Sequence, residues 1–510
     1  MKPVLIAALS GLIMTGSAIA TPAVLSVEEQ ITVPVFGKVM IYRPEPARGV
    51  RNVILFVSGD GGWNLGVVEM ARRAARDALV VGLSMPAWQK LVEKEHGRCW
   101  FPAGDLESTA QAIEKIYKLP RYINPILIGY SSGATAVYAA LAQAPAGAFA
   151  GAISLGFCPD MEVARALCPH GDWKPSYDPV KKRSLLPPRK DLAARADGVP
   201  RWTALQGAVD QVCDPGTVSK FAAQIPAAHV VSLPKVGHGF SAPRNWGEAY
   251  DQVIEALERP SNPSAPPPAG GSPGRPDPSP ESIRSRIESL SLPLEFLWPE
   301  RARDAVVFIS GDGGWAELDQ RIAAGLAAHG VAVVGWNTLQ YFWTARTPAE
   351  FRGDLARLVG VLPADVRLFL GGYSFGAEVA PVVMAGGPAG EFADAGDLSR
   401  IRALVLLAPG PYATFEVSPL DWIRTSEQPT RHPVDAAIEA GRGRPVLCVE
   451  ALQSGESGCP TTSVAGLTRV ALPGGHHFAG DFDGLVTRIL DFIGTQSGNA
   501  TGPDAGRVGP

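Results

Sequence analysis

Two serines stand in pentapeptides whose residue types suit nucleophilic chemistry. Residues 129–133 read Gly-Tyr-Ser-Ser-Gly, and residues 372–376 read Gly-Tyr-Ser-Phe-Gly. Each segment follows a short apolar run, the context in which Gly-x-Ser-x-Gly forms a sharp strand-to-helix turn that exposes the serine side chain. In a chain with 56 glycines one such pentapeptide is weak evidence, but the duplication strengthens it. Ser131 and Ser374 are therefore the candidate nucleophiles.

Both halves of the chain also supply a histidine in a shared local context. His238 is preceded by Leu-Pro-Lys-Val-Gly and followed by Gly-Phe, whereas His476 and His477 are preceded by Leu-Pro-Gly-Gly and followed by Phe. Alignment on the phenylalanine makes His238 and His476 equivalent, so we assign both as the general bases of the two serines. His477 has no counterpart in the first half, and we place it at the rim of the site as a substrate-binding or structural residue.

A carboxylate that orients the imidazole should lie between the serine and the histidine in chain order. Asp210 in the first half and Glu456 in the second each lie three residues before a cysteine and follow an apolar run. We therefore assign these two residues as the acids. The alternatives that remain open are Asp214 and Glu450.

The hexapeptide Ser-Gly-Asp-Gly-Gly-Trp occurs at 58–63 and again at 310–315, each time after an apolar run. Backbone N–H groups of such a turn, with the N–H that follows the nucleophile, can form an oxyanion hole. The candidate donors are Asp60, Gly61 and Ser132 in the first half and Asp312, Gly313 and Phe375 in the second. A dinucleotide-binding loop is disfavoured because Asn64 and Ala316 replace its third glycine, and a purely structural turn is the alternative.

Two features of the second half are candidates for substrate binding. Glu378 lies one helical turn after Ser374, where the first half has Thr135. A carboxylate there would suit a substrate with an ammonium group, and a surface or salt-bridged glutamate is the alternative. An aromatic run could line a pocket for an acyl group, although such residues are more often core; its members are Tyr341, Phe342 and Trp343.

The repeated motifs divide the chain into two homologous halves, and the spacing of apolar residues predicts their architecture. Apolar residues recur every four positions from 318 to 326 before Gly330, which predicts a helix, and residues 331–334 predict a buried strand. Strands that alternate with helices in this way form a mostly parallel sheet with helices on both faces. We therefore expect two tandem domains of the α/β-hydrolase class.

Composition sets the boundaries of these domains. Residues 260–280 are dense in Pro, Ser and Gly and predict an extended linker between domains at 21–259 and 281–496. Residues 497–510 predict a disordered tail.

The chain of 510 residues has a net charge of −4 and 46% hydrophobic residues, which is typical of globular proteins and argues against nonspecific nucleic-acid binding. The sequence indicates no metal and no organic cofactor.

The N-terminus has the features of a cleaved signal peptide at residues 1–20. Lys2 precedes an apolar stretch at 4–14, and Ala-Ile-Ala precedes Thr21. The apolar stretch is too short for a membrane anchor. We therefore expect export to the periplasm.

Export implies that the six cysteines form disulfides. Cys448 and Cys459 stand alone in the second half and should pair. The other four allow three pairings, of which Cys158 with Cys168 is the local choice. A zinc site is disfavoured because the sequence has no close Cys-x-x-Cys pair. The four first-half cysteines are Cys99, Cys158, Cys168 and Cys213.

The second half resembles the VirJ/AcvB family of exported bacterial serine hydrolases. The matching segments are 310–315, 341–343 with Arg-Thr-Pro at 346–348, 372–378 and 475–478. The first half resembles the N-terminal copy of two-copy, AcvB-type members, but it lacks the Tyr-Phe-Trp run, the acid after the serine motif and the histidine pair.

This resemblance implies a periplasmic hydrolase of lysyl- or alanyl-phosphatidylglycerol that acts at the outer face of the inner membrane. The family is also linked to virulence and type IV secretion, which implies periplasmic secretion components as partners. In this hypothesis Ser374 attacks the aminoacyl ester, His476 moves the proton, Glu456 orients the imidazole, and Glu378 or Asp312 meets the ammonium. The alternatives are a noncatalytic secretion accessory and a serine esterase that acts on a soluble ester. The oligomeric state stays open.

Overall fold

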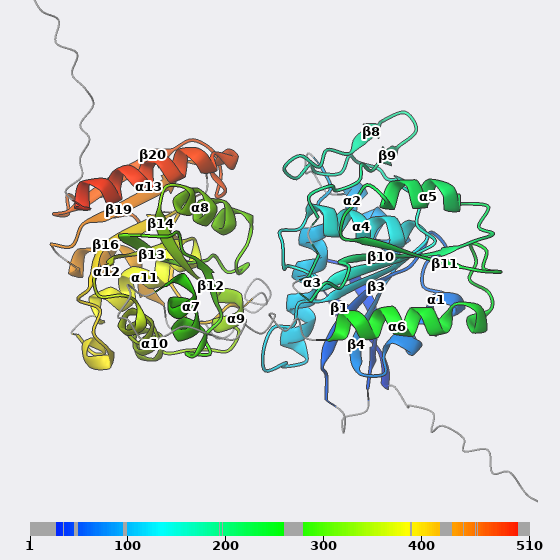
Figure 1. The fold of residues 1–510 in the computed structure, drawn as a ribbon, viewed down its shortest axis with the longest axis horizontal. Helices are drawn as coiled ribbons and strands as arrows, with labels where there is room; N and C mark the ends of the chain where they lie inside the picture. The colour runs from blue at the N-terminus through cyan, green and yellow to red at the C-terminus, as the bar shows by residue number, and fades with distance from the viewer. Residues whose placement is uncertain are drawn as a thin grey trace, which may run out of the picture.

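The computed structural model has two lobes, each built around one large sheet (Figure 1). The predicted signal peptide, nearly all of the predicted linker and nearly all of the predicted tail lie outside the residues that it describes. The described residues are 27–33, 35–44, 49–94, 99–192, 194–195, 197–259, 279–387, 390–418, 431–441, 443–453, 455 and 457–497.

The N-terminal lobe has an eight-stranded sheet in the order β1-β2-β4-β3-β5-β6-β10-β11. The strands are parallel from β4 to β11, and β1 and β2 add an antiparallel edge. The elements are β1 (Val27–Val33), β2 (Gly37–Arg43), β3 (Asn52–Val57), α1 (Leu65–Ala74), β4 (Ala78–Leu83), α2 (Met85–Lys94), α3 (Pro102–Ile116), β5 (Ile126–Tyr130), α4 (Ser132–Gln143), β6 (Gly151–Leu155), β7 (Asp160–Glu162), β8 (Ser176–Asp178), β9 (Arg183–Leu185), β10 (Trp202–Gly207), α5 (Pro215–Ala222), β11 (Ala228–Leu233), η1 (Pro243–Asn245) and α6 (Gly247–Glu258).

The C-terminal lobe repeats this plan with seven strands in the order β12-β14-β13-β15-β16-β19-β20, of which only β12 runs antiparallel to its neighbour. Its elements are α7 (Pro280–Glu288), β12 (Leu294–Leu297), β13 (Asp304–Ile309), α8 (Glu317–Ala328), β14 (Val331–Trp336), α9 (Thr338–Tyr341), α10 (Pro348–Val361), β15 (Arg367–Tyr373), α11 (Phe375–Ala385), η2 (Ala393–Ala395), β16 (Ile401–Leu407), β17 (Tyr412–Ala413), β18 (His432–Pro433), α12 (Val434–Ala440), β19 (Val446–Ala451), β20 (Leu467–Leu472), η3 (Phe478–Gly480) and α13 (Phe482–Ser497).

Helices cover both faces of each sheet, because the buried strands are apolar on both sides (Figure 1). In the N-terminal lobe α1 and α6 pack on the face of Ile54, and α2 to α5 pack on the face of Val53. In the C-terminal lobe α8 and α13 cover the face of Val306, and α10 to α12 cover the face of Val307. The expected fold class, two mostly parallel α/β sheets flanked by helices, is confirmed.

The two lobes meet around Trp343, which follows α9 and belongs to a core cluster with residues of both lobes. The indole Nε1 of Trp343 donates to the carbonyl oxygen of Leu119 at 2.8 Å. The ammonium of Lys115 donates to the Trp343 carbonyl at 2.5 Å and pairs with Glu416 at 3.0 Å. The ring of Tyr122 packs against the Trp343 ring with a centroid distance of 5.3 Å. Apolar packing and ionic contacts therefore join the lobes.

The structure corrects one cysteine pairing. Cys448 pairs with Cys459 as expected, but Cys158 does not pair with Cys168. Cys168 donates its N–H to the carbonyl of Trp100, which brings it beside Cys99, and the two form a disulfide. Cys158 lies three residues after β6, next to the loop that follows β10, and pairs with Cys213. The expectation was wrong because neighbouring strands of the sheet, not closeness in sequence, decide which sulfurs meet.

We predict that Gly376→Ala lowers the free energy of unfolding by about 3 kcal/mol, because the new Cβ would lie 2.1 Å from the carbonyl oxygen of Ile309. The matched control is Gly360→Ala in α10, where nothing lies within 4 Å. That change should stabilise the protein by about 0.5 kcal/mol. Thermal unfolding of the full chain measures both effects, and equal stability of the two variants would contradict this packing.

Candidate active site

Ser374 stands on a sharp turn between β15 and α11, and Ser131 stands on the same turn between β5 and α4. The backbone angles are φ 50° and ψ −118° at Ser374 and φ 55° and ψ −123° at Ser131. A positive φ is uncommon for a residue with a side chain and marks strain that the surroundings must hold. The turn lifts each hydroxyl above the end of its strand, where another group can reach it.

In both lobes an imidazole reaches the serine hydroxyl. Nε2 of His476 lies 2.7 Å from Oγ of Ser374, and Nε2 of His238 lies 2.9 Å from Oγ of Ser131. A hydroxyl and an imidazole at this separation can exchange a proton. The structure thus brings together both serine–histidine pairs that the repeat suggests.

Two tyrosines that the sequence analysis did not single out help to hold these histidines. The hydroxyl of Tyr373 donates to the backbone carbonyl of His476 at 3.2 Å, and the hydroxyl of Tyr130 donates to that of His238 at 3.0 Å. Their signal was available, because both pentapeptides carry tyrosine before the serine. The Tyr373 hydroxyl also lies 3.2 Å from Nδ1 of His477, which places His477 beside the site without contact to the serine.

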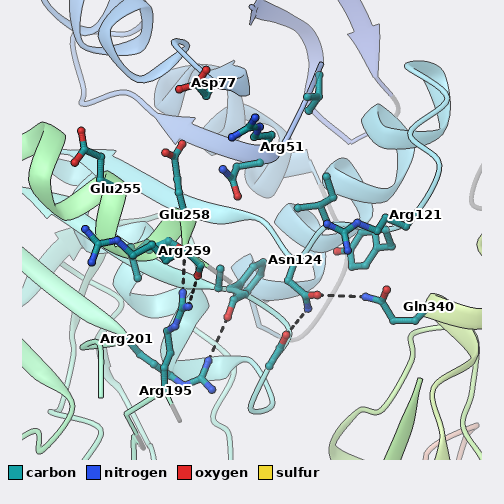
Figure 2. Close-up of a pocket in the computed structure, with 18 residues that line it drawn as sticks. Arg51, Asp77, Arg121, Asn124, Arg195, Arg201, Glu255, Glu258, Arg259 and Gln340 are labelled. Atoms are coloured by element: carbon teal, nitrogen blue, oxygen red, sulfur yellow. Dashed lines mark hydrogen bonds between the residues drawn. The ribbon is translucent and has the colours of Figure 1, made fainter. Parts of the chain in front are cut away.

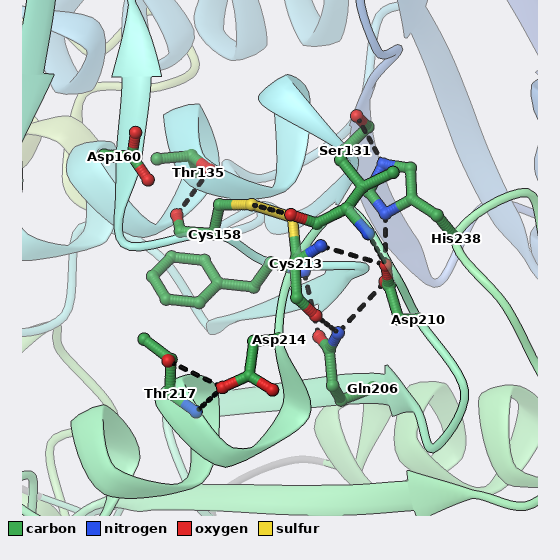
Figure 3. The surroundings of a disulfide bond; sticks show 12 residues. Ser131, Thr135, Cys158, Asp160, Gln206, Asp210, Cys213, Asp214, Thr217 and His238 are labelled. Carbon is green, nitrogen blue, oxygen red and sulfur yellow. Dashed lines mark hydrogen bonds and ion pairs between the residues drawn. A yellow bond between two sulfur atoms is a disulfide. The ribbon is translucent and has the colours of Figure 1, made fainter.

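The acid of the N-terminal lobe is held by its own loop (Figure 3). Oδ2 of Asp210 lies 2.9 Å from Nδ1 of His238, and Oδ1 accepts the N–H groups of Val212 and Cys213, each at 2.9 Å. Gln206 donates to Oδ2 at 3.1 Å and to the Cys213 carbonyl at 2.9 Å. The disulfide from Cys213 to the end of β6 fixes this loop against the sheet. Asp210 is therefore oriented to hold the imidazole.

The alternative acids have other partners. Asp214 caps α5 by accepting the N–H of Thr217 at 2.8 Å. Glu450 forms a two-pronged ion pair with Arg469, which lowers the pKa of the carboxyl through hydrogen bonding to the guanidinium. Glu456, the assigned acid of the C-terminal lobe, lies outside the described residues.

The glycine-rich turns pass directly beside the two nucleophiles. A Cβ added to Gly59 would lie 3.0 Å from Cβ of Ser131, and one added to Gly311 would lie 3.7 Å from Cβ of Ser374. Phe375 and Ser132 are the first residues of α11 and α4, so their N–H groups have no acceptor within the helix. A developing oxyanion could accept these N–H groups together with those of the adjoining turns.

The carboxylate of Asp312 influences both Glu378 and His476 in the C-terminal lobe. Glu378 accepts the N–H of Gly410 at 3.1 Å, and burial together with the charge of Asp312 raises its pKa to about 7. Burial of the His476 ring and the nearby His477 lower the pKa of His476 below 6.5, an effect that Asp312 opposes. The first lobe lacks this arrangement, because Thr135 at the position of Glu378 donates to the Cys158 carbonyl at 2.8 Å. The two sites therefore differ in charge.

The three side chains of the aromatic run have different neighbours. The hydroxyl of Tyr341 donates to Asp354 at 2.6 Å, and Trp343 packs between the lobes. Only Phe342 packs next to the nucleophile, with its ring 5.1 Å from that of Phe375. All three are buried, and the polar atoms of Tyr341 and Trp343 find partners inside the protein core. A role of the run in substrate binding stays a prediction.

With this geometry in view, comparison with known proteins places the second half of the chain. Residues 304–497 match the family of bacterial virulence protein VirJ. The C-terminal half belongs to the VirJ family. The match covers β13 to α13, which carry Ser374 and His476. We call this lobe, with its α/β fold, the VirJ lobe.

Several solved structures resemble about half of the chain. An α/β serine hydrolase without a lid from Xanthomonas campestris is 22% identical, with 47% of this chain and 97% of that chain covered and a TM-score of 0.29. An α/β serine hydrolase homologue from Coxiella burnetii is 19% identical, with 46% and 95% covered and a TM-score of 0.28. Est1E from Butyrivibrio proteoclasticus is 12% identical, with 45% and 96% covered and a TM-score of 0.28. No curated protein matches the sequence.

Three disulfides are formed by the six cysteines. Disulfides persist in oxidising compartments outside the cytoplasm. Among the described helices, none combines the length and the apolar character that crossing a membrane would require.

We predict that kcat/KM of the VirJ lobe on a neutral ester falls only below pH 6.5, because His476 must be neutral to accept a proton and its pKa is lowered. In Asp312→Asn the fall should move to still lower pH, since the carboxylate that stabilises the imidazolium is lost. Measurement of pH–rate profiles in a Ser131→Ala background isolates this site. A shift to higher pH in Asp312→Asn would contradict the assignment.

Proposed function

We propose that the VirJ lobe hydrolyses the aminoacyl ester of aminoacyl-phosphatidylglycerol, such as the lysyl or alanyl lipid, to phosphatidylglycerol and a free amino acid. The observation that carries the proposal is the 2.7 Å contact between Ser374 Oγ and His476 Nε2 on a strained turn beside a glycine-rich loop. This arrangement suits acyl transfer to a serine. The carboxylates of Glu378 and Asp312 favour a substrate that carries an ammonium group.

The proposed reaction has two stages. Ser374 Oγ attacks the ester carbonyl while His476 Nε2 takes the hydroxyl proton, and the N–H groups after β13 and at Phe375 stabilise the oxyanion. The imidazolium returns the proton to the departing glycerol oxygen of phosphatidylglycerol. His476 then activates water, which releases the amino acid and restores Ser374. Glu456 is the proposed acid that orients His476.

The proposed setting is the periplasm, at the outer face of the inner membrane, after removal of a signal peptide at residues 1–20. The three disulfides support a location outside the cytoplasm. The rival functions are an esterase that acts on a soluble ester and a noncatalytic accessory of type IV secretion with periplasmic partners.

A second hydrolytic site is proposed in the N-terminal lobe, because Ser131, His238 and Asp210 form a continuous hydrogen-bonded chain. A cavity of about 600 Å³ adjoins Ser131 and is lined by residues of β7 and β9 and by the Cys158–Cys213 disulfide. Thr135 in place of Glu378 favours a substrate without the ammonium group. The N-terminal lobe would then act on a different ester.

We predict that Ser374→Ala lowers hydrolysis of aminoacyl-phosphatidylglycerol by about 1,000-fold or more, because the nucleophile is lost. Ser131→Ala is the matched control and should retain this activity. Purified full chain is incubated with the lipid in detergent micelles, and phosphatidylglycerol and free amino acid are measured by mass spectrometry. The proposal would be contradicted if hydrolysis required Ser131 and not Ser374. A fluorophosphonate probe gives a separate check, because failure to label either serine would favour the accessory role.

We also predict that Glu378→Gln lowers kcat/KM for lysyl-phosphatidylglycerol more than for a neutral short-chain ester. Glutamine retains an acceptor for the Gly410 N–H but removes the charge that would meet an ammonium. Both substrates are assayed with the same protein preparation. Equal losses on the two substrates would show that Glu378 has no role in recognising the cation.

A further inference from the structure

A cavity of about 420 Å³, the interlobe cavity, lies between the two lobes, directly behind the glycine-rich turn of the VirJ lobe. The N-terminal lobe contributes Glu107 of α3, Tyr122 and residues 145–148, and the C-terminal lobe contributes residues 292–295 and 313–316. Figure 2 shows a neighbouring cavity, in which Gln340 donates across the lobes to Asn124 at 3.3 Å; both residues also line the interlobe cavity.

The side chains that line the interlobe cavity are suited to a cation. Two carboxylates, Glu107 and Glu295, line it, and none of its described lining residues is Lys, Arg or His. Burial and the charge of Asp312 raise the pKa of Glu107 to about 7. Carboxamide oxygens add neutral acceptors. The carboxamides come from Asn124, Asn337 and Gln340.

An unpaired hydroxyl in the same wall points independently to a ligand. Tyr122 lines the cavity, is 3% exposed, and its hydroxyl has no hydrogen-bond partner among the described residues. The ring is held against Trp343, so the hydroxyl is fixed in place. A buried polar group without a partner is costly, and an ammonium group in the cavity could donate to this oxygen.

The glycine-rich turn of the VirJ lobe lies between the interlobe cavity and the catalytic serine. Gly311 lies beside the side chains of Tyr373 and Ser374, whereas Gly313 and Gly314 line the cavity. Asp312 lies between these positions, and its charge acts on His476, Glu378 and Glu107. Asp312 is therefore within electrostatic range of the serine–histidine pair and of the Glu107 carboxylate that lines the interlobe cavity.

We propose that the interlobe cavity binds the side-chain ammonium of a lysyl group whose ester lies at Ser374, with Glu107 and Tyr122 of the N-terminal lobe as specificity-determining residues. The inference rests on the proposed function and deepens it. Glu378 and Asp312, nearer the serine, meet the α-ammonium that every aminoacyl lipid has, and the cavity receives the second cation that only a basic aminoacyl group has. The N-terminal lobe thereby sets the substrate preference of the VirJ lobe.

The test compares lysyl- and alanyl-phosphatidylglycerol with the full-length protein. Glu107→Gln keeps the shape of the side chain and removes its charge, so the ratio of kcat/KM for the lysyl lipid to that for the alanyl lipid should fall about tenfold. Tyr122→Phe removes only the unpaired hydroxyl, retains the ring packing on Trp343, and should lower the ratio in the same direction. The control is Glu69→Gln, which removes an exposed carboxylate from α1 of the same lobe and should leave the ratio unchanged.

A binding measurement separates this inference from the proposed function. Calorimetry with Ser374→Ala should show tighter binding of L-lysinamide than of L-alaninamide, and addition of Glu107→Gln should remove the difference. If wild-type protein cleaves both lipids but neither variant changes the ratio or the lysinamide affinity, the inference is overturned and the proposed function stands. If wild-type protein cleaves neither lipid, the proposed function fails, but the calorimetry still tests the cavity. Loss of selective lysinamide binding on addition of Glu107→Gln would support a cation site there, and retained selectivity would overturn it.

Discussion

The catalytic arrangement of both lobes depends on one steric constraint, the close approach of a strand to the helix that follows it. A Cβ on Gly372 would lie 2.3 Å from the carbonyl carbon of Gly376, and a Cβ on Gly129 would lie 2.1 Å from the carbonyl oxygen of Gly133. Only glycine permits this approach. It forces the serine between the two glycines to a positive φ, and this one turn both presents Oγ and leaves the following N–H free for an oxyanion.

The two lobes build around this shared turn in different ways. The N-terminal lobe fixes its acid loop by linking Cys213 to a neighbouring strand end, whereas the VirJ lobe links Cys459 back to Cys448 within β19. Four residues after the serine, the N-terminal lobe has Thr135, which donates to a backbone carbonyl, whereas the VirJ lobe has Glu378, which adds a carboxyl group. Duplication has retained the proton-transfer geometry and changed the groups that would contact a substrate.

The parts of the site that could be predicted from the sequence are those that local rules determine. The strand-to-helix turns and the α/β architecture follow from glycine spacing and apolar periodicity, and comparison of the two halves was enough to select His238 and His476 for the positions beside the serines. The Cys158 pairing and the places of Tyr341 and Trp343 depend on which distant segments become neighbours. Asp210 and Asp214 are four residues apart in the sequence. Their roles differ because Asp214 directly precedes α5 and caps that helix, whereas Asp210 contacts the imidazole of His238.

Several carboxyl groups of the VirJ lobe and its surroundings are coupled to Asp312, and together they favour binding of a cation. Burial raises the pKa of Glu378 and of Glu107, and the charge of Asp312 raises both further, so Asp312 disfavours the ionisation of each of these carboxyl groups. Like charges held together by the fold cost stability, and a bound ammonium would offset that cost by stabilising all of the ionised forms. The same Asp312 charge stabilises the imidazolium of His476, the form that follows attack by Ser374. In the proposed reaction, one carboxylate on the glycine-rich turn would link recognition of a positive substrate to the proton transfer that cleaves its ester.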